Sequence, residues 1–306
     1  MADPQQRLND GNPARPSYGG EREPDSHPTP GLPTIVQSAR VQLPTPVGTA
    51  PRSSPGVVRC LGVVAVQFAG RSVALDTSAG IWLAEAATSA KPDTVAALVP
   101  RSFEAFARVF HPAVRYVGDD DVEVRWASVA AANGTVAHPL MQWGSMTGSM
   151  EYFENDDQAP LWHGAPARGH LPAPVAERLV QVLTRWTTTP DVCWFAVAQG
   201  GAVITDHPTL SLPRCEYWVI NGPIGLAAAN MAAEPFEQSA NLWWPADRAW
   251  CVATDVDLVT SYVGGSAGCI AELLATEGLE TAPAEPGQRI TWDADQVNPA
   301  PFDAPD

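Results

Sequence analysis

The sequence predicts an α+β fold: a mixed or antiparallel central sheet with helices packed on it, preceded by a disordered proline-rich N-terminal tail. Three observations lead to this prediction. Strand-like and helix-like segments are mixed without the regular strand–helix alternation of a parallel sheet. The segments 193–198 and 249–256 are apolar on both faces, as central strands are. Residues 1–56 hold eleven of the thirty prolines and almost no aromatic side chains.

The same composition predicts the domain organisation. A segment as rich in proline and glycine as 1–56 buries too little apolar surface to offset the entropy lost on ordering. We therefore expect a disordered tail at 1–56, one globular α+β domain at 57–298 and a frayed C-terminal tail at 299–306. A domain of about 240 residues can bury a sizeable core.

The first half of the domain is predicted to contain a hairpin and two helices. They cover residues 57–75, 102–110 and 124–132, and an apolar run at 81–90 fits either type of element. In the helix at 102–110, Ser102 is a suitable N-cap, and Phe103, Phe106 and Phe110 recur on one face. The helix at 124–132 is expected to end at the following Asn-Gly pair.

The second half is predicted to alternate between helices and strands. Helices are expected at 174–186, at 223–232 and from Ser266 to about residue 277, and strands at 193–198, 210–212, 215–220 and 249–256. The helix at 174–186 has the clearest pattern, because Val175, Leu179 and Val182 line one side. The segment 241–248, which contains Trp-Trp-Pro, is expected to be a turn that leads into the strand at 249–256.

The charge balance excludes some classes of partner. The chain has 34 acidic and 18 basic residues and a net charge of −16, and none of this excess comes from 1–56, where five acids balance five arginines. An acidic surface repels phosphate backbones, so we expect no nucleic-acid partner. We see neither a secretory leader nor an apolar stretch that could span a bilayer, which predicts a cytoplasmic protein without a membrane partner. The sequence does not indicate the oligomeric state.

Cofactor and catalytic motifs are not found in the sequence. The five cysteines include no C-x-x-C pair, no glycine-rich loop has the spacing of a nucleotide site, and no G-x-S-x-G elbow is present. We therefore expect no cofactor.

The first candidate site is an aromatic segment that contains Trp243, Trp244, Asp247, Arg248 and Trp250. Tryptophan and arginine are the side chains that most often anchor protein interfaces, and an oriented guanidinium can bind a carboxylate in a bidentate manner. The alternative is structural: the indoles cover the sheet, and Asp247 and Arg248 brace a turn.

Two further candidates follow in the sequence. Asp255 and Asp257 are two residues apart, so on a strand both carboxylates would face one side and could hold Mg²⁺ or Ca²⁺. Gly264, Gly265 and Ser266 precede a predicted helix, whose N-terminus could receive an anion. The alternatives are a strand-ending turn for the aspartates and a tight turn into a capped helix for the glycines.

Several of these motifs resemble a family of uncharacterised actinobacterial proteins. The matching segments are 98–112, 142–143, 189–195, 239–257 (SANLWWPADRAWCVATDVD) and 262–266 (YVGGS). The resemblance spans about two thirds of the chain, roughly 98–298, and implies a single α+β cytoplasmic domain. No activity or ligand is known for that family, so the resemblance assigns no functional residue.

The sequence thus leaves three functions open. The first is a non-enzymatic binding or interaction protein, with regulation as one such role, whose partner is a protein or a small molecule that contacts the aromatic segment. The second is a metal-dependent hydrolase or transferase that uses Asp255 and Asp257, with an anion held at Gly264 and Gly265. The third is a domain that only dimerises.

Overall fold

The computed structural model describes residues 67–118, 120–150, 158, 160–199, 207–232, 236–302 and 304. These residues all belong to one compact unit, Thr34–Asp306. The predicted disordered tail at 1–56 and the first ten residues of the predicted hairpin lie outside the described residues. Among the helices that are described, none is long and apolar enough to cross a membrane.

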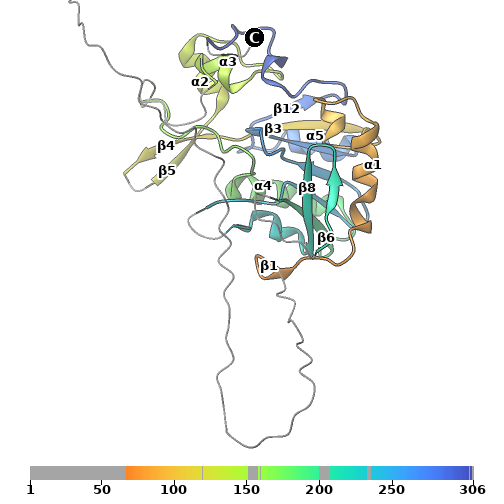
Figure 1. Cartoon of the computed structure of the whole chain (residues 1–306). Helices are drawn as coiled ribbons and strands as arrows, with labels where there is room; N and C mark the ends of the chain where they lie inside the picture. Colours follow the sequence, from red (N-terminus) through yellow and green to blue (C-terminus); the bar gives the residue numbers. More distant parts are fainter. Residues whose placement is uncertain are drawn as a thin grey trace, which may run out of the picture. The chain divides into compact units, whose positions relative to one another are not determined.

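The described residues form an eight-stranded sheet with the order β12-β3-β11-β10-β9-β6-β8-β7 (Figure 1). All neighbouring strands pair antiparallel. The strands are β3 (Ala105–Phe110), β6 (Cys193–Ala198), β7 (Leu210–Leu212), β8 (Cys215–Gly222), β9 (Leu242–Pro245), β10 (Cys251–Ala253), β11 (Thr260–Gly265) and β12 (Thr281–Ala284). The predicted α+β class is confirmed, and the sheet is antiparallel rather than mixed.

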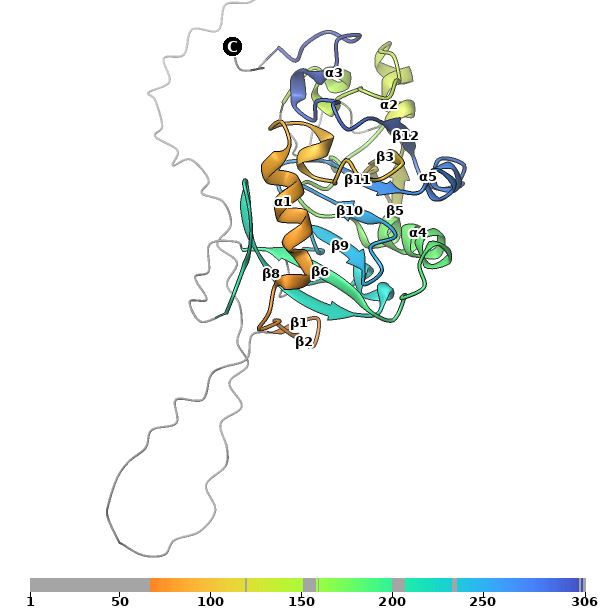
Figure 2. The same cartoon turned by 90° about the vertical axis from the view of Figure 1, so that its right-hand side faces the viewer.

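Two hairpins accompany this sheet, β1 (Gln67–Phe68) with β2 (Arg71–Ser72) and β4 (Ala113–Val117) with β5 (Asp120–Val124). The helices are α1 (Ile81–Ser89), α2 (Trp126–Asn133), α3 (Trp143–Thr147), α4 (Ala173–Leu183) and α5 (Ala267–Leu274). Short 3-10 helices are η1 (Ser78–Gly80), η2 (Val95–Ala97), η4 (Thr184–Trp186), η5 (Ile224–Ala228) and η6 (Trp292–Ala294). Figure 2 shows α1 on one side of the sheet and α4 and α5 on the other.

The sheet is buried on both faces because its strands are apolar at nearly every position. In β6, Phe195 packs into the core on the α4 and α5 side, and the adjacent Ala196 packs into the core on the α1 side. Successive side chains of a strand point to opposite faces, so continuous apolar runs produce two cores rather than one. A third core, built around Trp126, Trp143 and Trp162, lies beside α2 and α3.

The prediction of a helix at 102–110 is wrong. Residues Ala105–Phe110 form β3, which pairs with β11 on one side and β12 on the other. The spacing of Phe106 and Phe110 fits a helix, but Phe106 and Ala107 also alternate between the two cores. Strand pairing on both edges overrides the local pattern.

Other boundaries also differ from the predictions. The predicted helix at 223–232 is only the 3-10 helix Ile224–Ala228, and the predicted strand at 249–256 shortens to Cys251–Ala253. The Trp-Trp-Pro segment is the strand β9 and not a turn. The predicted helix at 174–186 is confirmed as α4 followed by η4.

Candidate functional site

The three tryptophans of the aromatic segment lie in the core. Trp243 and Trp250 are 1% and 0% exposed and stack edge-to-face at 5.1 Å on the α4 and α5 side of the sheet. Trp244 is 1% exposed and lies in the opposite core, where it contacts the ring of Trp82. The indoles therefore contribute packing, and of the five candidate residues in this segment Asp247 and Arg248 are exposed.

Asp247 and Arg248 contact different parts of the molecule. The Asp247 carboxylate accepts hydrogen bonds from the hydroxyls of Thr187 and Thr188 and from the backbone N–H of Thr188 at 2.7 Å. The Arg248 guanidinium lies 5.2 Å from the ring centroid of Trp82, a cation–π distance. Asp247 thus joins the residues that follow β9 to the segment that follows α4, and Arg248 contacts Trp82 of α1.

Gly264 and Gly265 are the last residues of β11, and Ser266 caps α5 by accepting the backbone N–H of Cys269. The backbone N–H of Ala267, the first residue of α5, donates to the Glu104 carboxylate at 2.9 Å. The protein's own carboxylate thus takes the position predicted for an anion. Gly265, Ser266 and Arg248 border one open groove, so two of the predicted sites lie together.

Asp255 and Asp257 lie elsewhere, in the turn after β10, and both contact Arg214. The Arg214 Nε is 3.1 Å from Asp255, and its terminal nitrogens are 2.9 Å from Asp93 and 3.3 Å from Asp257. Arg214 comes from the β7–β8 turn, and Asp93 follows α1. One guanidinium thus joins three segments that are far apart in the sequence.

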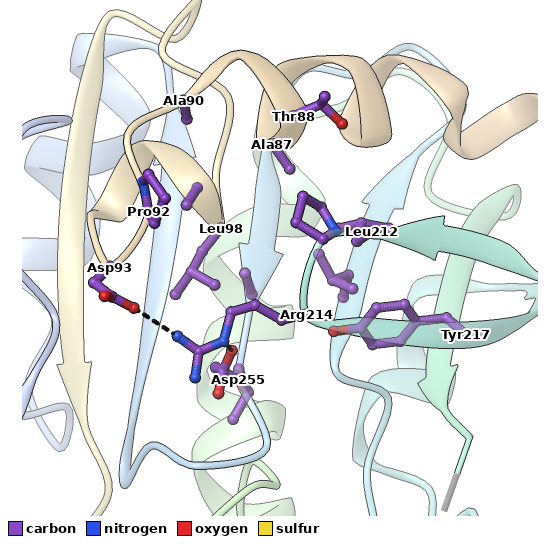
Figure 3. Close-up of a pocket in the computed structure, with 15 residues that line it drawn as sticks. Ala87, Thr88, Ala90, Pro92, Asp93, Leu98, Leu212, Arg214, Tyr217 and Asp255 are labelled. Carbon is purple, nitrogen blue, oxygen red and sulfur yellow. Dashed lines mark hydrogen bonds and ion pairs between the residues drawn. The ribbon is translucent and has the colours of Figure 1, made fainter.

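A cavity of about 150 Å³ opens beside this ion-pair cluster. Its walls are mainly apolar and come from the end of α1, the segment that follows it, β7, β9 and β10. The apolar lining residues are Ala87, Ala90, Pro92, Ala97, Leu98, Leu212, Pro213, Leu242 and Ala253. Arg214, Asp255, Asp93 and Tyr217 gather at one end, and Figure 3 shows Arg214 between the two carboxylates with the Tyr217 hydroxyl pointing toward them.

Asp255 is the least accessible charged group of the cluster, since its side chain is 3% exposed whereas Arg214 is 40% exposed. Burial raises the pKa of the Asp255 carboxyl above its ordinary value, while the backbone N–H of Asp257 and the charge of Arg214 act in the opposite direction. Burial likewise raises the pKa of Tyr217, so its hydroxyl stays protonated. Perturbed groups that converge in a concave, apolar site are typical of a functional site.

Gly169 fixes the turn that carries the two aspartates. It has φ +78°, and a Cβ at this position would lie 2.6 Å from the backbone oxygen of Val256. Its N–H donates to the carbonyl of Leu258, and its carbonyl accepts from the buried Asn241 side chain.

Gly169→Ala is therefore expected to lower the free energy of unfolding by about 2 kcal/mol more than Gly134→Ala does. Gly134 is the matched control, because it has φ +70° but a Cβ added there would meet no atom within 4 Å. Urea denaturation of both variants measures the difference. Equal losses would mean that the backbone contact at Val256 is not tight.

Metal binding has no support in the described part of the chain, where no three His, Cys, Asp or Glu side chains group so as to hold an ion. Asp255 and Asp257 each direct an oxygen to Arg214.

Comparisons of this chain with known protein families, with curated proteins and with solved structures found no match. The kinship with the actinobacterial family stays a prediction. The function is therefore inferred from the chemistry of the site.

The spacing of the aspartates indicated Asp255 and Asp257, but no motif indicated that Arg214 and Asp93 lie beside them. Arg214 is 41 positions before Asp255 and Asp93 is 121 positions before Arg214, and neither belongs to a motif. The one signal in the sequence was Arg214 itself, a charged residue in the predicted two-residue turn between the strands at 210–212 and 215–220.

Proposed function

We propose that the protein binds a small molecule in the cavity between α1 and the sheet. The observation that carries this proposal is the pairing of apolar walls with one polar end, where Arg214, Asp255 and Tyr217 converge. Ligand sites are commonly concave and mostly apolar, with a few polar groups that orient the ligand. The proposal keeps the first function predicted from the sequence, a binding protein, but moves its site away from the aromatic segment.

The cavity sets the size of the ligand. Its volume of about 150 Å³ equals that of an engineered apolar cavity of roughly 150 Å³ that binds benzene. The ligand that fits has an apolar part no larger than one aromatic ring or a short branched alkyl group. Its polar part lies at the Arg214 end.

The metal-dependent hydrolase or transferase stays a prediction, and no contact of Asp255 or Asp257 within the described part of the chain favours it. The ion pairs of both residues are instead consistent with the polar end of a binding site.

Blocking the cavity tests the proposal. Ala90 lines the cavity just after α1, is half-buried and has an extended backbone that accepts a larger residue. Ala90→Phe is expected to reduce the affinity for benzyl alcohol at least about tenfold, because the added ring occupies the volume that the ligand needs. Ligand-observed NMR titration of the full-length protein measures this affinity.

Ser89→Phe is the matched control. Ser89 is the neighbouring residue, is exposed and is not part of the cavity lining. This variant is expected to bind benzyl alcohol as the unmodified protein does. Equal binding by the Ala90→Phe variant, or no binding by the unmodified protein to any probe of this size, would contradict the proposal.

A further inference from the structure

Among the residues that the structure describes, the charges at the polar end of the cavity do not balance. Three carboxylates, Asp93, Asp255 and Asp257, contact one guanidinium, and a second arginine, Arg168, contacts Asp257. Three negative and two positive charges leave an excess of one negative charge. The net charge of −16 on the whole chain has the same sign.

The three carboxylates differ in how far water can compensate them. Asp93 and Asp257 are about half exposed, at 49% and 55%, so water solvates them well. Asp255 is 3% exposed and lines the cavity. Its oxygens accept from the Arg214 Nε and from the backbone N–H of Asp257. A buried carboxylate gains most from an added cationic donor, because water stabilises it least.

We propose that Asp255 binds the ammonium group of a small amine whose apolar part fills the cavity. This inference rests on the proposed function and names its ligand class. Arg214 occupies the cation position when no ligand is bound. Its side chain is 40% exposed and has two other carboxylate partners, so it can leave Asp255 and keep Asp93 and Asp257 as partners. The Tyr217 hydroxyl, which points toward the same place in Figure 3, adds an acceptor for the ammonium.

The same geometry disfavours an anionic ligand. A ligand carboxylate would have to displace one of three carboxylates from Arg214 and would then lie beside the buried charge of Asp255. The ligand carboxylate and Asp255 would repel each other strongly, because apolar walls screen like charges poorly. A neutral ligand is expected to bind with intermediate affinity, because it gains the apolar contacts but does not compensate the charge of Asp255.

Three probes of one shape test this inference on the full-length protein: benzylamine, benzyl alcohol and benzoate. Calorimetric or NMR titration at neutral pH is expected to give affinities in the order amine, alcohol, benzoate, with the amine about tenfold tighter than the alcohol. Asp255→Asn keeps the shape of the side chain and is expected to abolish the preference for the amine. Glu85→Gln, the matched control at an exposed residue of α1 outside the cavity lining, is expected to retain it.

Arg214→Met provides a second and independent readout. Removing the internal competitor is expected to raise the ratio of benzylamine affinity to benzyl alcohol affinity several-fold, because only the amine takes the place of the guanidinium at Asp255. Thermal denaturation confirms that each variant is folded, and if Asp255→Asn fails to fold, the Arg214→Met arm still decides.

The outcomes separate this inference from the proposed function. If no probe binds, the proposed function fails and the ligand class with it. If benzyl alcohol binds but benzylamine binds no tighter, or benzoate binds best, the cavity is a ligand site and only the amine assignment is overturned. An unchanged or lower ratio of benzylamine affinity to benzyl alcohol affinity in Arg214→Met also overturns the assignment.

Discussion

Replacing Trp250 by alanine is expected to lower the free energy of unfolding by roughly 4 kcal/mol. The side chain is fully buried, packs edge-to-face on Trp243 and donates from its indole N–H to the carbonyl of Leu183 at 3.0 Å. Its loss removes a large apolar surface, leaves a cavity between the sheet and α4, and deprives a buried carbonyl of its donor. Urea denaturation followed by circular dichroism measures the change.

Trp194→Ala is the comparison for this variant. Trp194 lies on β6, is only half-buried and packs at the margin of the other core. Its loss is expected to cost clearly less than that of Trp250. If Trp250→Ala cost less than about 1 kcal/mol, the indole would not be a core residue, and the aromatic segment would again be a candidate surface for a partner.

The stability of the protein is expected to fall as the pH falls from about 6.5 to about 4, in part because of His111. This side chain is fully buried between the carbonyl of Ala167 at 2.7 Å and the hydroxyl of Ser261 at 2.9 Å. A carbonyl can only accept, so Nδ1 carries the proton and Nε2 accepts from Ser261. Burial lowers the pKa of His111 from 6.5 to about 4, and the charges of His170 and Arg108 act in the same direction, against the hydrogen bond to Ala167.

The folded protein loses stability on acidification because the unfolded chain binds a proton at this imidazole more readily than the folded protein does. Below about pH 6.5 the unfolded chain protonates its imidazole and the folded protein does not, so protons favour unfolding until the pH reaches about 4. The full effect is roughly 3 kcal/mol, of which about 2 kcal/mol falls between about pH 7 and about pH 5.

His111→Gln isolates this contribution because glutamine does not titrate. Urea denaturation at the two pH values is expected to show that the unmodified protein loses about 2 kcal/mol more than the variant loses over the same interval. Parallel losses in the two proteins would show that His111 is accessible to water or charged when folded.

The fold class could be predicted from the sequence because burial on both faces leaves a direct signature. The run Cys193–Ala198 is apolar at every position, and this alone indicates a central strand. In the strand predicted at 249–256, Trp250 and Val252 lie in one core and Cys251 and Ala253 in the other, as expected of a strand that is apolar on both faces.

The strand β11 could not be predicted, because it is stabilised by pairing with its neighbours rather than by a local sequence pattern. Thr260–Gly265 ends in two glycines that suggest a turn, yet it lies between β10 and β3 in the sheet. A Cβ on Gly264 would lie 2.5 Å from Val99 and 2.6 Å from Phe103, so close packing is one reason for this glycine. Such a contact joins segments more than 150 residues apart and leaves no local pattern.

The candidate site also depends on contacts between segments that are far apart in the sequence. Asp255 was found from the spacing of two aspartates, but the spacing suggested a metal because it could not reveal that Arg214 lies between them and Asp93. The apolar residues that line the cavity, such as Leu98, Leu212 and Ala253, are of the same types as ordinary core residues, so the sequence does not distinguish them. Only the fold shows that these side chains leave a space beside a buried carboxylate.

A crystal structure of the full-length protein soaked with benzylamine tests whether the cavity beside Asp255 is the ligand site. We expect the aromatic ring to lie between Leu98, Leu212 and Ala253, with the amine nitrogen within hydrogen-bond distance of Asp255 and Arg214 turned away from it. A ring bound instead in the groove beside Trp82 and Arg248, with the cavity beside Asp255 empty, would contradict this expectation.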